Sequence, residues 1–538
     1  MRIELRDSLE NVFFDSVIAA RPCRRLALDV ARNGTAAVHI LLNDLPAGSR
    51  FNVAVRKKGR VVRKAQWFQL LDVPVEENTG LVGFTTRTRT LNVFPHTGKR
   101  NAPNPHVIRK APFRTFDIMQ PVRGGAVRSE AATTALRLHL PIAASAKPGV
   151  HEFTIAISSG QITQNLVVQV RVHGVVIPPA DRSALPYTNW FGFSHIAKHH
   201  GLKLWSGPYW RMLRKYADLM QRGRQNCVLV YNNDLFEMTP QGPVLDRQRL
   251  RRIVKIFTDA GIYYIEGSWV AGRKEWTSPT FEAALSMKPA TTPEGYATIE
   301  AICRQLGEEI AANGWKDRWL QHVADEPLPL NASDYRILCG IVRKLMPGIL
   351  IMDAIQDPTL VGSVDMWCPQ VQEYERDREA YEATRAQGDK VWCYTCCFPG
   401  GPWLNRLLDQ ELLRPALIGW GVALYKLDGF LHWGLNWWEG DCRKLTSPAR
   451  PAEKPKANRL PPGDTHMIYP GAAGPLSGLR FEAHREGFED HALLRRLQKE
   501  NPRAAAAVLR KVIRGFSDYT KDVQRFRAGR KMLLEALS

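Results

Sequence analysis

The first third of the chain contains short runs in which apolar and polar residues alternate. Turn residues such as Pro148-Gly149 separate the runs, which lie at 36–42, 51–56, 135–142, 151–158 and 165–177. Alternation with a period of two places the apolar side chains on one face of a β-strand. Short strands at this spacing are typical of a β-sandwich. We therefore predict an all-β sandwich domain over residues 1–178.

A different pattern begins after the proline-rich passage 178–186, which marks a domain boundary. Apolar runs of strand length now alternate with segments of helical periodicity, such as 209–223, 296–314 and 335–346. The eight candidate strands lie at 188–193, 227–232, 263–269, 319–326, 349–355, 364–370, 391–396 and 429–436. This alternation predicts a (β/α)₈ barrel of the TIM type over residues 183–500. The strand count depends on which runs are accepted, so a doubly wound open sheet is the alternative.

The C-terminal part adds three features to this multidomain architecture. Residues 443–465 are rich in Pro and Lys, and we expect a mobile loop there, at the rim of the barrel after its eighth strand. A helix is predicted at about 487–499. Residues 501–538 are predicted to form a basic helical tail.

The composition is that of an ordinary globular protein, with 44% hydrophobic and 24% charged residues in a chain of 538. No stretch approaches the roughly 20 apolar residues that a membrane-spanning helix needs. The first 15 residues carry Glu4, Asp7 and Glu10 where a signal peptide needs an apolar run. We therefore expect no membrane association and a cytoplasmic location, or a periplasmic or secreted one if the start site lies upstream.

The formal net charge of +21 raises the question of a polyanionic partner. The most concentrated basic run, at 56–64, alternates with valines and is typical of a hairpin with a solvated face. The sequence has no zinc-finger, basic-zipper or helix-turn-helix signature. We therefore predict no nucleic-acid partner, and the oligomeric state stays open.

Neither the cysteines nor the histidines form a convincing metal or disulfide pattern. The nine cysteines have no framework spacing, and the single C-x-x-C, Cys393 to Cys396, is followed by Cys397 in a segment predicted to be a buried strand. His195, His199 and His200 follow the first barrel strand, but no carboxylate spacing accompanies them. We predict no metal and no cofactor.

Two adjacent acids, Asp325 and Glu326, end the fourth candidate barrel strand. Reactive groups of such barrels lie where strands end and βα loops begin. Two acids after an apolar run are costly to bury without partners or a purpose. Carboxyl groups at this place fit acid/base chemistry on an acetal. Pro327 is expected to push Glu326 toward an extended conformation.

The adjacency of the two acids leaves an alternative open. Neighbouring side chains of a regular strand face opposite ways, so Asp325 would point toward the helices unless a bulge or an early strand end intervenes. In that alternative Asp325 caps a helix or forms a salt bridge, and Glu326 alone is functional.

The tetrapeptide ADEP at 324–327 resembles the catalytic Asp-Glu pair of glycoside hydrolase family 123. The segments at 392–406, 428–438, 469–471 and 479–497 resemble the C-terminal pattern of the related family catalogued as domain of unknown function 4091. The resemblance covers residues 183–500, and the preceding sandwich is similar to the N-terminal domain of that family.

The resemblance implies a β-N-acetylgalactosaminidase that works by substrate-assisted catalysis with retention of configuration. Glu326 would be the general acid/base, and Asp325 would orient the 2-acetamido group, whose carbonyl oxygen is the nucleophile. Glu326 must then carry a proton at the working pH, which a poorly hydrated aromatic cleft would favour.

Aromatic and polar residues near the strand ends are the candidates for sugar contacts. The aromatic candidates are Trp392, Tyr394, Trp433, Trp437 and Trp438, of which Tyr394 is expected to touch the acetamido group. The polar candidates are Glu266 and Asn436, with Asn189, Asn232 and Gln370 as weaker ones. Each of them has a structural alternative in the core, in a loop or as a helix cap.

Two rival functions remain at this point. One is a glycosidase for a sugar without an acetamido group, which would need a further carboxylate, Glu266 or Asp353, as nucleophile. The other is a carbohydrate-binding protein without catalytic activity. The predicted partner in all three cases is a carbohydrate.

Overall fold

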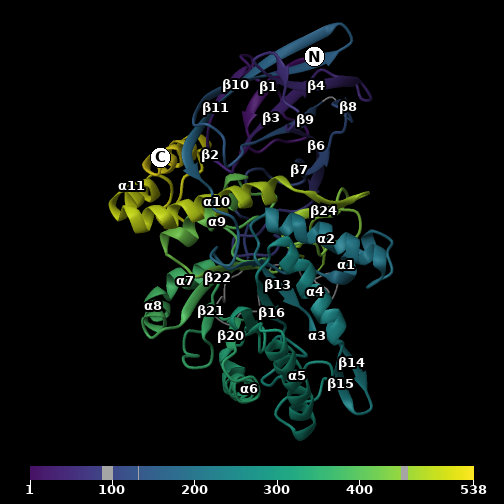
Figure 1. Ribbon diagram of the computed structural model, residues 1–538, viewed down its shortest axis with the longest axis vertical. Coiled ribbons are helices and arrows are strands. Elements are labelled where there is room, and N and C mark those ends of the chain that lie inside the picture. The colour runs from purple at the N-terminus through teal and green to yellow at the C-terminus, as the bar shows by residue number, and fades with distance from the viewer. Residues whose placement is uncertain (88–100, 131–132, 450–458) are drawn as a thin grey trace.

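The computed structural model describes residues 1–87, 101–130, 133–449 and 459–538. Two antiparallel-rich sheets lie at one end of the elongated molecule and an eight-stranded barrel at the other, with C-terminal helices between them (Figure 1). The predicted fold class is confirmed.

The N-terminal unit is a sandwich of two sheets. One sheet has the order β1-β3-β9-β6-β7, and the other has β2-β11-β10-β4-β5 with β8 beside β4. The sheets enclose an apolar core that includes Ile40, Leu138, Ile155 and Val168. One ladder, between β2 and β11, is parallel. The strands span Arg2–Asp7, Arg25–Arg32, Thr35–Asn43, Arg50–Lys57, Arg60–Val61, Gln66–Val75, Phe113–Pro121, Ala126–Arg128, Thr134–Pro141, Gly149–Ser159 and Ile162–Val176.

The second unit is a parallel barrel rather than an open sheet. Its strands follow the order β12-β23-β22-β21-β20-β19-β16-β13. The two end strands meet through Tyr187, whose amide donates to Asn226 Oδ1 (3.0 Å) and whose carbonyl accepts from the Asn226 amide (3.1 Å). In chain order the strands span Tyr187–Asn189, Cys227–Val230, Tyr264–Gly267, Trp319–Gln321, Leu350–Ala354, Met366–Cys368, Lys390–Thr395 and Gly429–His432. Each of the eight predicted runs therefore overlaps a barrel strand.

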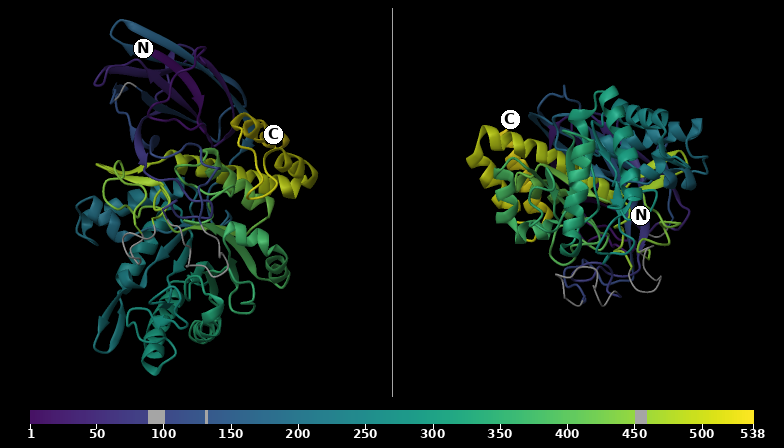
Figure 2. Two further views of the ribbon diagram at one scale, coloured as in Figure 1. Left: turned by 180° about the vertical axis from the view of Figure 1, so that it is seen from behind. Right: turned by 90° about the horizontal axis from the view of Figure 1, so that it is seen from below.

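Helices surround the barrel (Figure 2), and local signals set their ends. The side chain of Ser206 caps α2 by accepting from the Tyr209 amide, and Thr292 does the same for α5 at Gly295. Gly261, with a φ of 98°, ends α4 in the left-handed conformation. The helices span α1 Phe193–His199, α2 Gly207–Arg222, α4 Arg247–Ala260, α5 Pro293–Ala312, α6 Ala332–Leu345, α7 Val371–Arg376, α8 Arg378–Ala386 and α9 Leu413–Leu424.

The C-terminal helices join the two units (Figures 1 and 2). α10 spans Leu479–Glu500, so it starts about eight residues earlier than predicted, and the segment 479–483 is its first turn. α11 (Pro502–Val512) and α12 (Val523–Ala536) follow. Arg527 of α12 bonds Asp7 of the sandwich and Glu486 of α10. The basic tail is therefore helical as predicted, but two of its arginines, Arg527 and Arg530, are bound to acids in the interior.

Two long connections reach the rim of the barrel. The segment between β6 and β7 packs on the loop after β22, where the Phe84 amide donates to the Cys397 carbonyl (3.1 Å). In the connection after β23, Thr446 bonds Glu76 of the sandwich, and Leu460 lies near the barrel mouth. The described part of 443–465 is thus packed rather than solvated, and residues 450–458 lie outside the described residues.

Within the described residues, no helix combines the length and apolar character that crossing a membrane requires. The basic run at 56–64 forms the predicted hairpin of β4 and β5.

Candidate active site

A cavity of about 380 Å³ opens at the carboxyl ends of the barrel strands, where the sequence places the reactive groups. Its wall contains Trp190, which directly follows β12, and Tyr231, which follows β13. Tyr394 of β22 and Trp433, just after β23, also line it. Asp325 and Glu326 are the two carboxylates in this wall among the described residues.

The backbone at the acidic pair explains how both side chains reach one cavity. β19 ends at Gln321, and Glu326 has a φ of 45°, in the left-handed region. The expectation of an extended Glu326 before Pro327 was therefore wrong. Left-handed backbone costs about 1–2 kcal/mol for a residue with a Cβ atom. Arg273 offsets part of this cost, because its guanidinium donates to the carbonyls of Asp325 (2.7 Å) and Glu326 (2.9 Å).

The electrostatic environment keeps a proton near the pair. Burial raises the pKa of Asp325, the charge of Glu326 raises it further, and the result is about 7 although Arg273 acts in the opposite direction. Two carboxyl groups so close together share protons as a unit. The pair therefore holds a proton up to about neutral pH.

Side chains from the ends of two other barrel strands, β20 and β22, hold the carboxylate of Glu326. The hydroxyl of Tyr394 donates a short hydrogen bond to Glu326 Oε1, and Gln356 Nε2 donates to the same oxygen (3.1 Å). Gln356 and Gln370 also donate to the Tyr394 hydroxyl, at 2.9 and 3.0 Å. Burial and the neighbouring Glu326 raise the pKa of Tyr394. Tyr394 thus remains a neutral donor that fixes one oxygen of Glu326.

A buried charge cluster lies behind the pair. His322 Nδ1 bonds Asp353 Oδ1 (3.0 Å), and His322 Nε2 bonds Glu266 Oε2 (3.3 Å). Burial alone would lower the pKa of His322, but these two hydrogen bonds outweigh it and raise the pKa to about 9. Asp353 also accepts from the two amides that follow His322. The cluster thereby fixes the chain just before the acidic pair.

Three of the ten predicted sugar contacts line the cavity, namely Tyr394, Trp433 and Trp437. The other seven are buried outside its wall: Glu266, Asn436, Trp438, Trp392, Asn189, Asn232 and Gln370. Glu266 belongs to the cluster with His322 and accepts from the Trp190 indole (3.0 Å). Asn189 is bound by Gln225 and Arg406.

Asn436 supports the cavity wall from behind. Its amide bonds both the N–H (2.8 Å) and the carbonyl (3.1 Å) of Gly192. A Cβ atom on Gly192 would lie 3.1 Å from the Trp437 ring, so the glycine allows this indole to approach closely. The Trp438 indole donates to the Ile468 carbonyl (2.8 Å), and Trp392 packs in the barrel interior.

Sequence reasoning missed five of the eight aromatic residues in the wall, Phe398 among them. Trp190, Tyr231, Trp269 and Trp276 line the cavity, and the first three lie within two residues of a strand end. That position was the available signal. Cys396 and Cys397 also line the cavity, because β22 ends at Thr395; the prediction of a buried strand over 391–397 was wrong for these two residues. All nine cysteines are free thiols.

Two of the three histidines after the first strand pack against the tryptophans that follow β23. The His195 ring packs edge-on against Trp437, and His199 does so against Trp438, with ring centroids 4.9 and 5.0 Å apart. Across the described ranges, no group of three or more His, Cys, Asp or Glu side chains could hold a metal ion.

An aromatic cavity with a carboxyl pair at the mouth of a (β/α)₈ barrel is typical of a carbohydrate-active enzyme. Residues 246–497 match the family model described as "Glycoside hydrolase 123, catalytic domain". The resemblance to glycoside hydrolase family 123 is therefore confirmed over these residues, and it supports a glycosidase.

A solved structure agrees with the fold over the whole chain. A family 123 glycoside hydrolase from Clostridium perfringens, described in connection with glycolipid glycan hydrolysis, aligns over 100% of this chain and 97% of its own. The TM-score is 0.72 at 13% sequence identity. A β-glucuronidase from Parabacteroides merdae matches at a TM-score of 0.32 and 7% identity, over 91% of this chain and 51% of its own. A comparison with curated proteins gave no match.

Proposed function

We propose that the protein hydrolyses β-linked 2-acetamido sugars, with N-acetylgalactosamine as the sugar, and that it does so with retention by substrate-assisted catalysis. The supporting observation is the cavity wall itself. Among the described residues it contains the adjacent Asp325 and Glu326 and no opposed carboxylate. A protein nucleophile in a retaining enzyme lies across the bond, with about 5 Å between the two carboxyl groups.

The rival nucleophiles are poorly placed. Glu266 and Asp353 are fully buried and are both bound to His322. Moving either carboxylate into the cavity would break a buried ion cluster, at a cost of about 3–5 kcal/mol. The acetamido oxygen of the substrate therefore remains the best candidate for the nucleophile.

The proposed roles follow from the contacts of the pair. Glu326 protonates the leaving oxygen and later takes a proton from water, while Tyr394 and Gln356 hold one of its oxygens. Asp325 accepts the acetamido N–H, which orients the carbonyl oxygen toward the anomeric carbon and stabilises the cationic ring that forms. Trp433 and Trp437 stack on the apolar face of the sugar.

The Clostridium perfringens relative is described as acting on glycolipid glycans. We propose the same class as the first natural substrate to test here.

The decisive experiment compares aryl β-N-acetylgalactosaminide with aryl β-galactoside for the wild type, Glu326→Gln and Asp325→Asn. We expect turnover of the acetamido substrate alone, and a loss of about 10²–10⁴-fold in kcat/KM in each variant. With a dinitrophenyl leaving group, which needs no proton, Glu326→Gln should recover bond cleavage and Asp325→Asn should not. The exposed Glu439, just past Trp438, provides the matched control Glu439→Gln.

Inhibition by a thiazoline analogue of N-acetylgalactosamine would support the acetamido nucleophile. Hydrolysis of both aryl substrates with a trapped glycosyl-enzyme would contradict it and point to a protein nucleophile. Sugar binding without turnover of any substrate would indicate a binding protein.

A further inference from the structure

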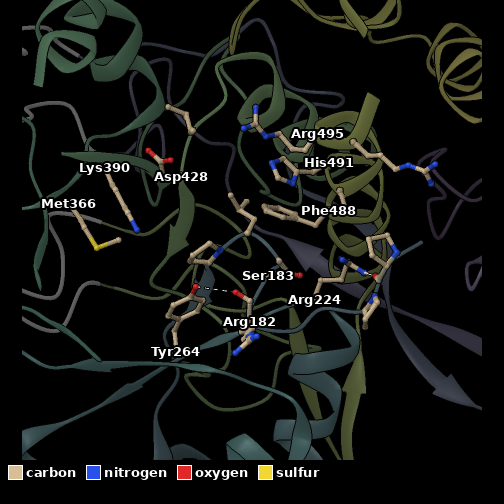
Figure 3. A pocket seen from close by; sticks show the side chains of 18 of the residues that line it. Arg182, Ser183, Arg224, Tyr264, Met366, Lys390, Asp428, Phe488, His491 and Arg495 are labelled. Atoms are coloured by element: carbon tan, nitrogen blue, oxygen red, sulfur yellow. Dashed lines mark hydrogen bonds between the residues drawn. The ribbon is translucent and has the colours of Figure 1, made fainter. Parts of the chain in front are cut away.

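A second cavity, of about 620 Å³, lies at the opposite end of the barrel from the candidate active site. Its floor contains the first residues of four strands, Tyr264, Leu350, Met366 and Lys390. The linker 178–186 and α10 form its walls. Figure 3 shows His491 and Arg495 on the α10 side of this space, with Lys390 and Met366 on the other side. Its volume is within the usual range for sites that bind small molecules, about 300–1,000 Å³.

The charge of this cavity is not balanced. Six basic side chains line it against three acidic ones, and one acid, Glu500, pairs with Arg496 at 2.7 Å. The remaining basic residues have no carboxylate within 4.0 Å in the part of the chain that the structure describes: Arg182, Arg224, Lys390, Arg495 and Lys499. Unpaired charge of one sign in a recess attracts ions of the opposite sign.

Three polar side chains of this cavity, His491, Arg495 and Arg224, lie close together. His491 is buried, with 5% of its surface exposed. Its Nε2 atom has no hydrogen-bond partner among the described residues. Burial lowers the pKa of His491, and the nearby Arg495 and Arg224 lower it further, to about 3. The imidazole is therefore neutral, and its free nitrogen lies within the influence of both guanidinium groups.

The backbone conformation of Arg224 is a second feature typical of a ligand site. Its φ is 70°, a left-handed value at a position where glycine would fit without strain. Within the described residues, its guanidinium donates one hydrogen bond, to the Pro178 carbonyl at 3.0 Å. Strained residues of this kind cluster at ligand sites.

We propose that this cavity binds a phosphomonoester, whose dianionic phosphate lies among Arg224, Arg495 and His491 and whose organic part packs on Tyr264 and Leu350. Guanidinium groups match phosphate oxygens with paired N–H donors. The charge surplus is larger than a single carboxylate would offset, and Leu350, 39% exposed, provides an apolar surface for the organic part.

Calorimetric titration of the full chain tests this proposal, with glucose 6-phosphate, inorganic phosphate and uncharged glucose at equal ionic strength. We expect saturable binding of the ester at one site. Arg224→Gly and Arg495→Gln should each weaken it at least tenfold, and the exposed Arg510→Gln on α11 should change it less than twofold. Arg224→Gly relieves the backbone strain, so it should fold at least as well as the wild type.

Nuclear magnetic resonance of the histidine side chains gives a test without a disruptive variant. The signal that disappears in His491→Gln identifies the His491 imidazole. Glucose 6-phosphate should raise the pKa of this imidazole, because an adjacent anion favours its charged form. If the titration with glucose 6-phosphate shows no saturable binding heat, or if all variants bind it with equal affinity, the proposed phosphate site is wrong. Equal affinity for inorganic phosphate and the ester would support the phosphate position and overturn the packing of an organic part.

Discussion

In the acidic pair, Asp325 lies where water cannot fully hydrate its carboxylate. Asp325 lines an aromatic cavity next to another carboxyl group, and burial followed by the charge of Glu326 raises its pKa from 3.8 to about 7. A raised carboxyl pKa means that the folded chain binds a proton more tightly than the unfolded chain does. The native state is therefore penalised whenever Asp325 is ionised.

This penalty predicts that Asp325→Asn stabilises the fold while it destroys function. Below about pH 4 the wild-type carboxyl is protonated in both states, so the two proteins should unfold alike. Between pH 4 and 7 the wild type loses stability, and above pH 7 the variant should be more stable by about 2–3 kcal/mol, after allowance for solvent in the cavity. Denaturant unfolding at pH 5 and pH 8 measures the difference.

The exposed Asp317→Asn serves as the control for this comparison, and it should show no such pH dependence. A variant that is less stable than the wild type at pH 8 would contradict the electrostatic account of Asp325.

At the scale of elements, the turn that carries Asp325 and Glu326 depends on a residue far away in sequence. Arg273 follows the short strand β17 (Ala271–Gly272) and bonds the carbonyls of Asp325 and Glu326, more than 50 residues later. Its guanidinium also lies 4.0 Å above the Trp276 ring. One side chain thus links the left-handed turn to the aromatic wall.

We predict that Arg273→Lys lowers kcat about 10–100-fold with little change in the folded structure, because a lysine cannot donate to two carbonyls in a fixed fork. Steady-state kinetics on an aryl glycoside and circular dichroism measure the two quantities. The neighbouring exposed Lys274→Ala should leave kcat unchanged. A higher KM with an unchanged kcat would argue against a positioning role for Arg273.

The same contact marks the limit of what the sequence could predict. Period-two and period-3.6 patterns are local, and they located all eight barrel strands and five sandwich strands, including β3 and β10. They missed β1, β2, β6 and β7. The conformation of Glu326 depends on Arg273, and the burial of Asn436 depends on Gly192, so neither could be read from neighbouring residues. The resemblance to family 123 identified the carboxyl pair, but not the surroundings that tune it.

At the scale of the whole molecule, arginine–carboxylate contacts hold the sandwich and the barrel together. Arg480 of α10 bonds Asp117 of β7 (3.0 Å), and Arg530 of α12 bonds Asp490 of α10 (2.9 Å) and the carbonyl of Asp29 in β2 (2.8 Å). Part of the high arginine content is therefore structural. The net charge of +21 is consequently a weak guide to partners.

Arg527 is the contact whose loss should be felt most widely. It joins Asp7 of β1 to Glu486 of α10. Burial alone would raise the pKa of Glu486, but Arg527 and Arg530 outweigh it and lower the pKa to about 2. A lowered carboxyl pKa stabilises the fold above about pH 4.5, and this stabilisation disappears as the pH falls through 2.

Arg527→Met should therefore destabilise the protein by about 3 kcal/mol at pH 7, because it leaves two buried carboxylates short of a partner. The difference from the wild type should shrink below pH 4, where the wild type itself loses this contribution. Urea unfolding at pH 7 and pH 3.5 measures both values. Arg525→Met, two residues earlier and exposed on the same helix, should cost less than about 1 kcal/mol at either pH. Equal losses in the two variants would mean that α12 contributes by packing alone, and that the charge contacts do not hold the two units together.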